Sequence, residues 1–129
     1  MEDQIQLLQF FLCKEFRQER QDEYTAERIQ SNRYVPHFPF SPGPLYAVTC
    51  WRKDKRFHKE VIEYATDYGE SIRSPHMDIE PITSSVLFRW HKHLIPAHFV
   101  IKKPTTLTIR VILDRRPVFE TYLLIEKGP

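Results

Sequence analysis

Glycine is scarce in this chain of 129 residues, which contains only Gly43, Gly69 and Gly128. Walker and Rossmann sites need several glycines within a short stretch, because the backbone of the loop must approach the phosphate closely. No Gly-x-Ser-x-Gly motif is present either, so the strained turn that exposes the nucleophile of α/β hydrolases is missing. The sequence therefore excludes the common nucleotide-binding loops and that class of hydrolase.

Cysteine is equally scarce, with Cys13 and Cys50 as the two residues of this type. Two cysteines do not make the disulfide framework that stabilises small secreted domains. The sequence has no Cys-x-x-Cys pair, which excludes zinc knuckles and thioredoxin-like redox sites on spacing. We interpret both cysteines as free thiols in a reducing compartment, and we predict that no cofactor is bound.

Long apolar runs are missing as well. The apolar stretch 7–13 is interrupted by Gln9 and followed by Lys14 and Glu15, so it falls short of the about 20 apolar residues that cross a membrane. The first residues lack the basic segment of a signal peptide. We therefore expect a protein that is not inserted in a membrane, is not secreted, and is located in the cytoplasm or the nucleus.

Charge of one sign does not dominate, because 19 basic residues face 17 acidic ones and the net charge is +2. A protein dedicated to duplex DNA usually carries a larger basic excess gathered in a stripe. Hydrophobic residues make up 41% of the chain, which is enough to build a core. The length fits one unit, so we predict a single α+β domain over residues 1–129.

Two segments are predicted to be helices. Residues 4–30 contain neither glycine nor proline, and Ile5, Leu8 and Leu12 recur at helical spacing. Residues 54–68 carry a second set of apolar residues at helical spacing, and Gly69 follows where a helix commonly ends. Between these helices, the proline-rich segment 31–44 is predicted to be an extended connector.

The rest of the chain is predicted to form strands. Strand composition appears at 45–52, 84–91 and 97–101, and a turn joins 105–113 to 118–126 as an antiparallel hairpin. These elements predict an α+β fold of order α-β-α-β-β-β-β, with two helices on one face of a mainly antiparallel four- to five-stranded sheet. The N-terminal helix and the connector would precede a β/α core at 45–127.

Histidine is the residue type that most suggests chemistry. His91 and His93 flank Lys92 in a predicted strand and therefore share a face, and His98 follows nearby. Three such side chains could bind zinc or act as an acid–base pair. No carboxylate lies within the segment, so we predict no metal and interpret the histidines as solvent-facing or hydrogen-bonded side chains at a sheet edge.

Cationic and aromatic side chains alternate around the same strand, a mixture typical of single-stranded nucleic-acid binding. Trp90 shares its predicted face with Val86 and Phe88, which favours a place in the core instead. The residues of a nucleic-acid surface would be Arg89, His91, Lys92, His93, Lys102, Lys103 and Arg110.

Two patterns suggest binding to another protein. One is the glutamate row Glu15, Glu19, Glu23 and Glu27, whose i, i+4 spacing brings like charges together on a helix, so that a basic partner would relieve the repulsion. The other is Arg33, Pro36 and Pro39, which match the Arg-x-x-Pro-x-x-Pro pattern of polyproline ligands. The alternatives are a solvated helix face offset by nearby arginines, and a connector packed onto the domain.

From these observations we predict a non-enzymatic intracellular module that binds another protein through the N-terminal helix, the connector or a sheet edge. Its partner would be another protein, for example one with a basic surface, and a sheet edge could also pair two copies of the chain. Binding of RNA or single-stranded nucleic acid is the first alternative. A small metal- or histidine-dependent enzyme is the second.

Overall fold

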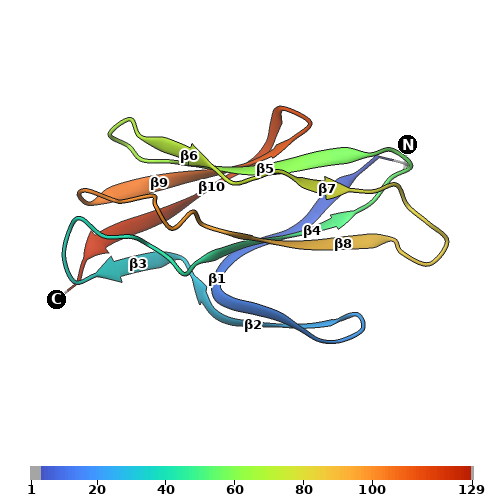
Figure 1. The fold of residues 1–129 in the computed structure, drawn as a ribbon, viewed down its shortest axis with the longest axis horizontal. Coiled ribbons are helices and arrows are strands. Elements are labelled where there is room, and N and C mark those ends of the chain that lie inside the picture. The colour runs from blue at the N-terminus through green and yellow to red at the C-terminus, as the bar shows by residue number, and fades with distance from the viewer. Residues whose placement is uncertain (1–3, 129) are drawn as a thin grey trace.

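The chain folds into two β-sheets that pack face to face (Figure 1). The computed structural model describes residues 4–128, and every regular element in this range is a strand. No helix with the length and apolar composition of a membrane span occurs in residues 4–128. The strands are β1 (Gln6–Arg20), β2 (Glu23–Gln30), β3 (Asn32–Val35), β4 (Tyr46–Arg52), β5 (His58–Ala65), β6 (Ser71–Arg73), β7 (Met77–Ile79), β8 (Phe88–Leu94), β9 (Thr105–Leu113) and β10 (Arg116–Lys127).

The four-stranded sheet has the order β2-β1-β4-β8, and the six-stranded sheet has the order β3-β10-β9-β5-β6, with β7 also paired to β5. All pairs are antiparallel except β3 with β10. The predicted α+β fold with two helices is therefore wrong. The core lies between the sheets and includes Trp51 of β4, Tyr64 of β5 and Ile109 of β9.

The predicted helix 4–30 is instead a hairpin of β1 and β2. The turn between them uses Asp22, which adopts a left-handed φ of 63° without any glycine. The apolar run fits a strand covered on both faces, since Leu12 lies in the main core whereas Cys13 packs in a second cluster. A strand covered on both faces loses the alternation that would distinguish it from a helix.

The second predicted helix is also wrong, because residues 58–65 form β5, which lies in the six-stranded sheet between β9 and the short strands β6 and β7. Its side chains alternate, and His58, Glu60, Ile62 and Tyr64 are all buried. A spacing of four residues returns a side chain to the same face of a strand as well as to nearly the same face of a helix. Two ionisable residues on the buried face of this strand concealed its period of two.

The predicted hairpin near the C-terminus is confirmed as β9 and β10. Leu107, Ile109 and Val111 of β9 are fully buried, as expected. On β10, however, an irregularity between Pro117 and Phe119 shifts the register. It places Leu123 and Ile125 inside, and leaves Val118 and Tyr122 exposed.

The proline-rich connector is packed down rather than free. Its first residues form β3, which pairs with the end of β10. Phe40 exchanges backbone hydrogen bonds with Ile101, at 2.9 and 2.8 Å, and Phe38 packs with Phe40 against the core. The connector therefore closes one end of the sandwich.

The β1–β2 hairpin curls back under the four-stranded sheet (Figure 1). Beyond Cys13 the hairpin no longer pairs with β4, and Phe16 and Tyr24 stack on each other with ring centroids 5.4 Å apart. Both rings also lie against Trp90 of β8, at 5.6 and 5.1 Å. This aromatic cluster covers the outer face of the sheet and buries Val48 and Cys13 completely.

Candidate functional site

The two sheets leave an open groove on one side of the sandwich. In the four-stranded sheet, β1 pairs with β2 only from Leu12 onward, and in the other sheet β10 pairs with β3 only from Leu124 onward. Within residues 4–128, the first half of β1 and the stretch 116–123 of β10 therefore each have a neighbouring strand on one side only.

A cavity of about 930 Å³ lies between these two free edges. Its apolar wall joins the sheets, because the rings of Phe10 and Phe119 lie 5.3 Å apart. Leu8, Val118 and Phe119 remain exposed along it. The groove is lined by residues 4–10 together with Trp51, Asp54, Arg56, His58, Leu113, Asp114, Arg116, Val118 and Phe119.

The polar end of the groove is built on His58, whose side chain is buried. Its Nε2 lies 2.8 Å from Oδ1 of Asp54, and its Nδ1 lies 2.5 Å from Oδ2 of Asp114. An ionised carboxylate only accepts hydrogen bonds, so the ring satisfies both partners when both nitrogens carry protons. Burial alone would lower the pKa of His58, but the hydrogen bonds to Asp114 and Asp54 raise it above its usual value.

The pKa values of Asp54 and Asp114 are both lowered, which favours their ionised forms. Burial tends to raise the pKa of Asp54, but hydrogen bonds from the Arg56 amide, His58 and the Ile5 amide lower it below its usual value. Burial likewise opposes ionisation of Asp114, and the hydrogen bonds from His58 and the Lys59 amide lower its pKa. The group is therefore a buried histidine ring held between two carboxylates that favour its charged form, and each carboxylate also accepts a hydrogen bond from a backbone amide.

Arg56 and Arg116 line the same end of the groove. Neither side chain forms an ion pair with another of the described residues. The charge of Arg56 also helps to lower the pKa of Asp114. With His58 in its charged form, the cationic side chains that line the groove outnumber its two carboxylates.

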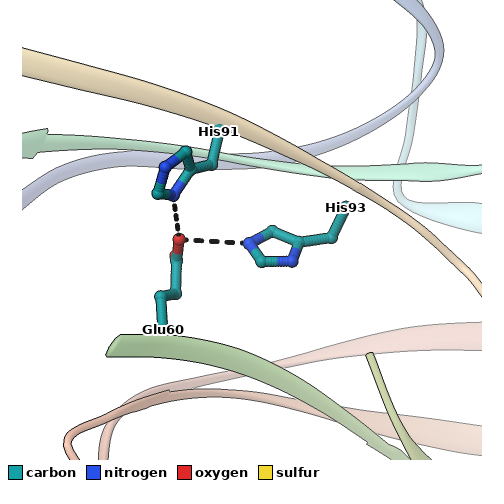
Figure 2. Close-up of side chains that lie close together, drawn as sticks. All are labelled: Glu60, His91 and His93. Atoms are coloured by element: carbon teal, nitrogen blue, oxygen red, sulfur yellow. Dashed lines mark hydrogen bonds and ion pairs between the residues drawn. The ribbon is translucent and has the colours of Figure 1, made fainter. Parts of the chain in front are cut away.

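A second polar centre lies between the sheets (Figure 2). Glu60 reaches across from β5, and His91 and His93 reach toward it from β8 in the opposite sheet. His91 Nδ1 lies 2.6 Å and His93 Nε2 lies 3.1 Å from the same oxygen, Oε1 of Glu60. The other oxygen, Oε2, accepts a hydrogen bond of 2.9 Å from the indole of Trp51.

The carboxylate of Glu60 is fully buried and yet ionised. Burial raises its pKa, but the hydrogen bonds from His91 and His93 outweigh this and lower the pKa to about 2. His93 is held on its far side, where Nδ1 lies 3.3 Å from the hydroxyl of Ser74. A buried charge is tolerated when it is paired and hydrogen-bonded, as it is here.

The structure brings together only part of the predicted histidine site. His91 and His93 share a face, as the strand pattern predicted, but that face is the interior. His98 is exposed in a separate loop near Glu70 and Ser71. The missing carboxylate is supplied by Glu60, more than 30 residues earlier.

The residues predicted for nucleic-acid binding do not form one surface. His91 and His93 face the interior, whereas Lys92 points outward and donates to the carbonyl of Phe16. Ion pairs engage several of the others, and Lys103 lies over the ring of Tyr68. The pairs are Arg89 with Glu80, Lys102 with Glu70, and Arg110 with Glu63 and Glu120.

Trp90 of β8 lies on the outer face of the four-stranded sheet, not in the main core. Trp90 belongs to the cluster under the curled hairpin, and Val86 and Phe88 are exposed. The prediction that these three residues share the core is therefore wrong.

The glutamate row lies on the β1–β2 hairpin rather than on a helix, and its charges are compensated. Arg17 forms ion pairs with Glu15, Glu19 and Glu27, at 3.4, 2.8 and 2.9 Å. Glu23 lies 3.9 Å from Arg20. The helical repulsion from which a basic partner was inferred is therefore absent.

The polyproline pattern is part of the folded connector. Arg33 lies in β3, where it pairs with Ile125 of β10, and its guanidinium is 5.5 Å from the centre of the Phe40 ring. Pro36 and Pro39 are exposed beside it. An arginine held in this way differs from the free extended ligand that the pattern suggested.

Sequence reasoning missed Asp54, His58, Glu60 and Asp114. The available signal was the alternation His58, Glu60, Ile62, Tyr64, which places two ionisable groups on the apolar face of a possible strand. Comparison of the chain with known protein families, curated proteins and solved structures finds no match.

Proposed function

We propose that this protein is a non-enzymatic binding module that takes up an extended segment of another protein in the groove between β1 and β10. The bound segment adds a strand to the free edge of β10 and places alternate side chains on the apolar wall. Recognition of this kind draws affinity from backbone hydrogen bonds and specificity from side-chain pockets. The observation that supports it is the pair of unpaired strand edges that open onto one apolar groove.

The edge of β10 is favoured over the other free edges by its composition. Natural proteins protect edge strands with charges, prolines, bulges or short length. The edge strand β8 carries Arg89 and Lys92, and β6 and β7 have three residues each. On β10 the protective features, Pro117 and the irregularity after it, stop at Phe119. From there to Leu123 the single charge is Glu120.

The charges in the groove indicate what the bound segment carries. Arg56 and Arg116 lack ion pairs among the described residues and lie at the same end as His58. Phe10 and Phe119 form the apolar part farther along. The segment that fits has apolar side chains at alternate positions and an acidic side chain at the end that meets the two arginines.

The test is selection of peptides from a phage-displayed random library on the full chain, followed by affinity measurements with synthetic peptides. We expect selected peptides with alternating apolar residues and an acidic end. Hydrogen exchange of the bound complex should slow at backbone amides within 116–123. Phe119→Asp should weaken binding at least about tenfold, because it places a carboxylate on the apolar wall.

The control is Val100→Asp, which changes a residue of similar exposure outside the groove (40% against 38% for Phe119). This variant should bind as the wild type does. Peptides that bind equally well to Phe119→Asp, or protection that appears on another strand, would contradict the proposal. A dimer in sedimentation that Phe119→Asp dissociates would identify a second copy of the chain as the occupant instead.

A further inference from the structure

We propose that Glu60, His91 and His93 form a binding site for a divalent transition-metal ion, with zinc the best match. This site lies inside the sandwich and is independent of the groove proposed for peptides. In the sequence, no carboxylate lies near the histidines, and this was the reason to predict that no metal binds. In the fold, Glu60 of the opposite sheet lies beside both histidines and supplies the carboxylate (Figure 2).

The ligand atoms converge on one point. One oxygen of Glu60 and one ring nitrogen from each histidine lie within 4.8 Å of one another. Bonds of about 2.0–2.2 Å from an ion to each atom are within reach of small side-chain rotations. The ion would take the place of the two ring protons that now bridge the histidines to the carboxylate, and both rings would bind in their neutral form.

The residues behind the ligands are arranged as a metal site requires. Trp51 holds Oε2 of Glu60, so Oε1 is left to face the histidines. Ser74 Oγ already accepts a hydrogen bond from the Ile62 amide, at 2.9 Å, and can accept a second from His93 Nδ1 once Nε2 binds the ion. Metal-binding histidines commonly donate their second N–H in this way, which fixes the ring and its tautomer.

The ligand set also indicates which ion binds. Two imidazole nitrogens and one carboxylate oxygen suit zinc and its first-row neighbours, whereas calcium and magnesium prefer oxygen alone. His91 gives the site an entrance, because its side chain is 11% exposed while Glu60 and His93 are completely covered. Three protein ligands leave a fourth position, which a water molecule fills in many zinc sites.

The experiment is calorimetric titration of zinc into full-length protein that has been treated with chelator and purified without a histidine tag. We expect about one zinc per chain and at least about tenfold weaker binding for His91→Ala. His98→Ala is the matched control, since it removes an exposed histidine outside the cluster, and it should keep the wild-type affinity. Folding of each variant is checked by circular dichroism.

A readout on the wild type covers the case in which a variant fails to fold. In protein labelled with nitrogen-15 on its histidine rings, zinc should shift the signals of His91 Nδ1 and His93 Nε2 and leave His98 unchanged. Absence of zinc binding, binding that survives His91→Ala in folded protein, or shifts confined to exposed histidines would each overturn the proposal.

Discussion

At the scale of single residues, the most consequential side chains are polar groups that the fold buries with their partners. Asp54 shows this well, because its carboxylate is 4% exposed and accepts hydrogen bonds from His58 and from two backbone amides. One residue thereby ties the loop before β5 to the residue that precedes β1. Removing a group of this kind costs more than its own hydrogen bonds, since the partners stay buried without it.

Stability should depend on pH through Asp54. Its pKa in the folded protein lies below the usual value of 3.8, so its contribution is present above that value and is lost as pH falls through the folded pKa. We expect Asp54→Asn to lower the free energy of unfolding by about 2 kcal/mol at neutral pH. The difference from wild type should shrink toward zero in strong acid.

Denaturant unfolding followed across the acid range measures this difference. Asp78→Asn is the control, because Asp78 is exposed and lies 3.6 Å from the ring of His76, which is exposed as well. This substitution should change stability by less than about 0.5 kcal/mol. An Asp54→Asn protein whose deficit stayed constant into strong acid would show that its cost is steric rather than electrostatic.

At the scale of elements, the β1–β2 hairpin is the one most dependent on tertiary contacts. A two-stranded hairpin is marginal on its own, and beyond Cys13 no strand among residues 4–128 pairs with this one from outside. Its position is set by Phe16 and Tyr24, which pack on Trp90, and by the hydrogen bond from Lys92 to the Phe16 carbonyl.

Trp90→Ala should release the hairpin while leaving the sandwich folded. The lost ring contacts are worth about 0.5–1.5 kcal/mol each beyond the apolar area that they bury. We expect hydrogen exchange at amides 14–27 to speed up at least about tenfold, with much smaller changes in β9 and β10. Phe88→Ala, on the same strand but 49% exposed, should have little effect. Equal acceleration in every strand would refute local release.

At the scale of the whole molecule, stability rests on the residues between the two sheets. Val111 of β9 is fully buried there, beside strands β5 and β10. We expect Val111→Asp to abolish soluble expression, because burying an unpaired carboxylate costs several kcal/mol out of a total of about 5–15. Tyr122→Asp changes a residue of the neighbouring strand that is 56% exposed, and it should express as the wild type does.

Soluble and cooperatively unfolding Val111→Asp protein would mean that this face of β9 is not the interior. Thermal unfolding of both variants, recorded with the wild type, distinguishes the outcomes. A loss of expression in Tyr122→Asp as well would place both faces of β10 under cover and would contradict the exposed outer face of this strand.

The sequence by itself determined the late part of the fold. The hairpin 105–113 and 118–126 was predictable, because the alternating apolar residues of β9 and the polar turn after them are local signals. It also determined that His91 and His93 share a face, since a strand returns to the same face at every second residue. The packed connector follows from its aromatic content, which was one of the two interpretations of that segment.

Only the tertiary structure decided that residues 4–30 and 54–68 are strands. Apolar residues four positions apart fit either secondary structure, and the choice depends on what covers each face. The outer face of β1 is covered by a hairpin that curls back on it, and the inner face of β5 carries His58 and Glu60, whose partners come from distant segments. The convergence of Glu60, His91 and His93 was equally beyond the sequence, because it is fixed by which strands face each other across the core. Which strands face each other across the core depends on how the whole chain buries its apolar side chains, and no local sequence pattern encodes this.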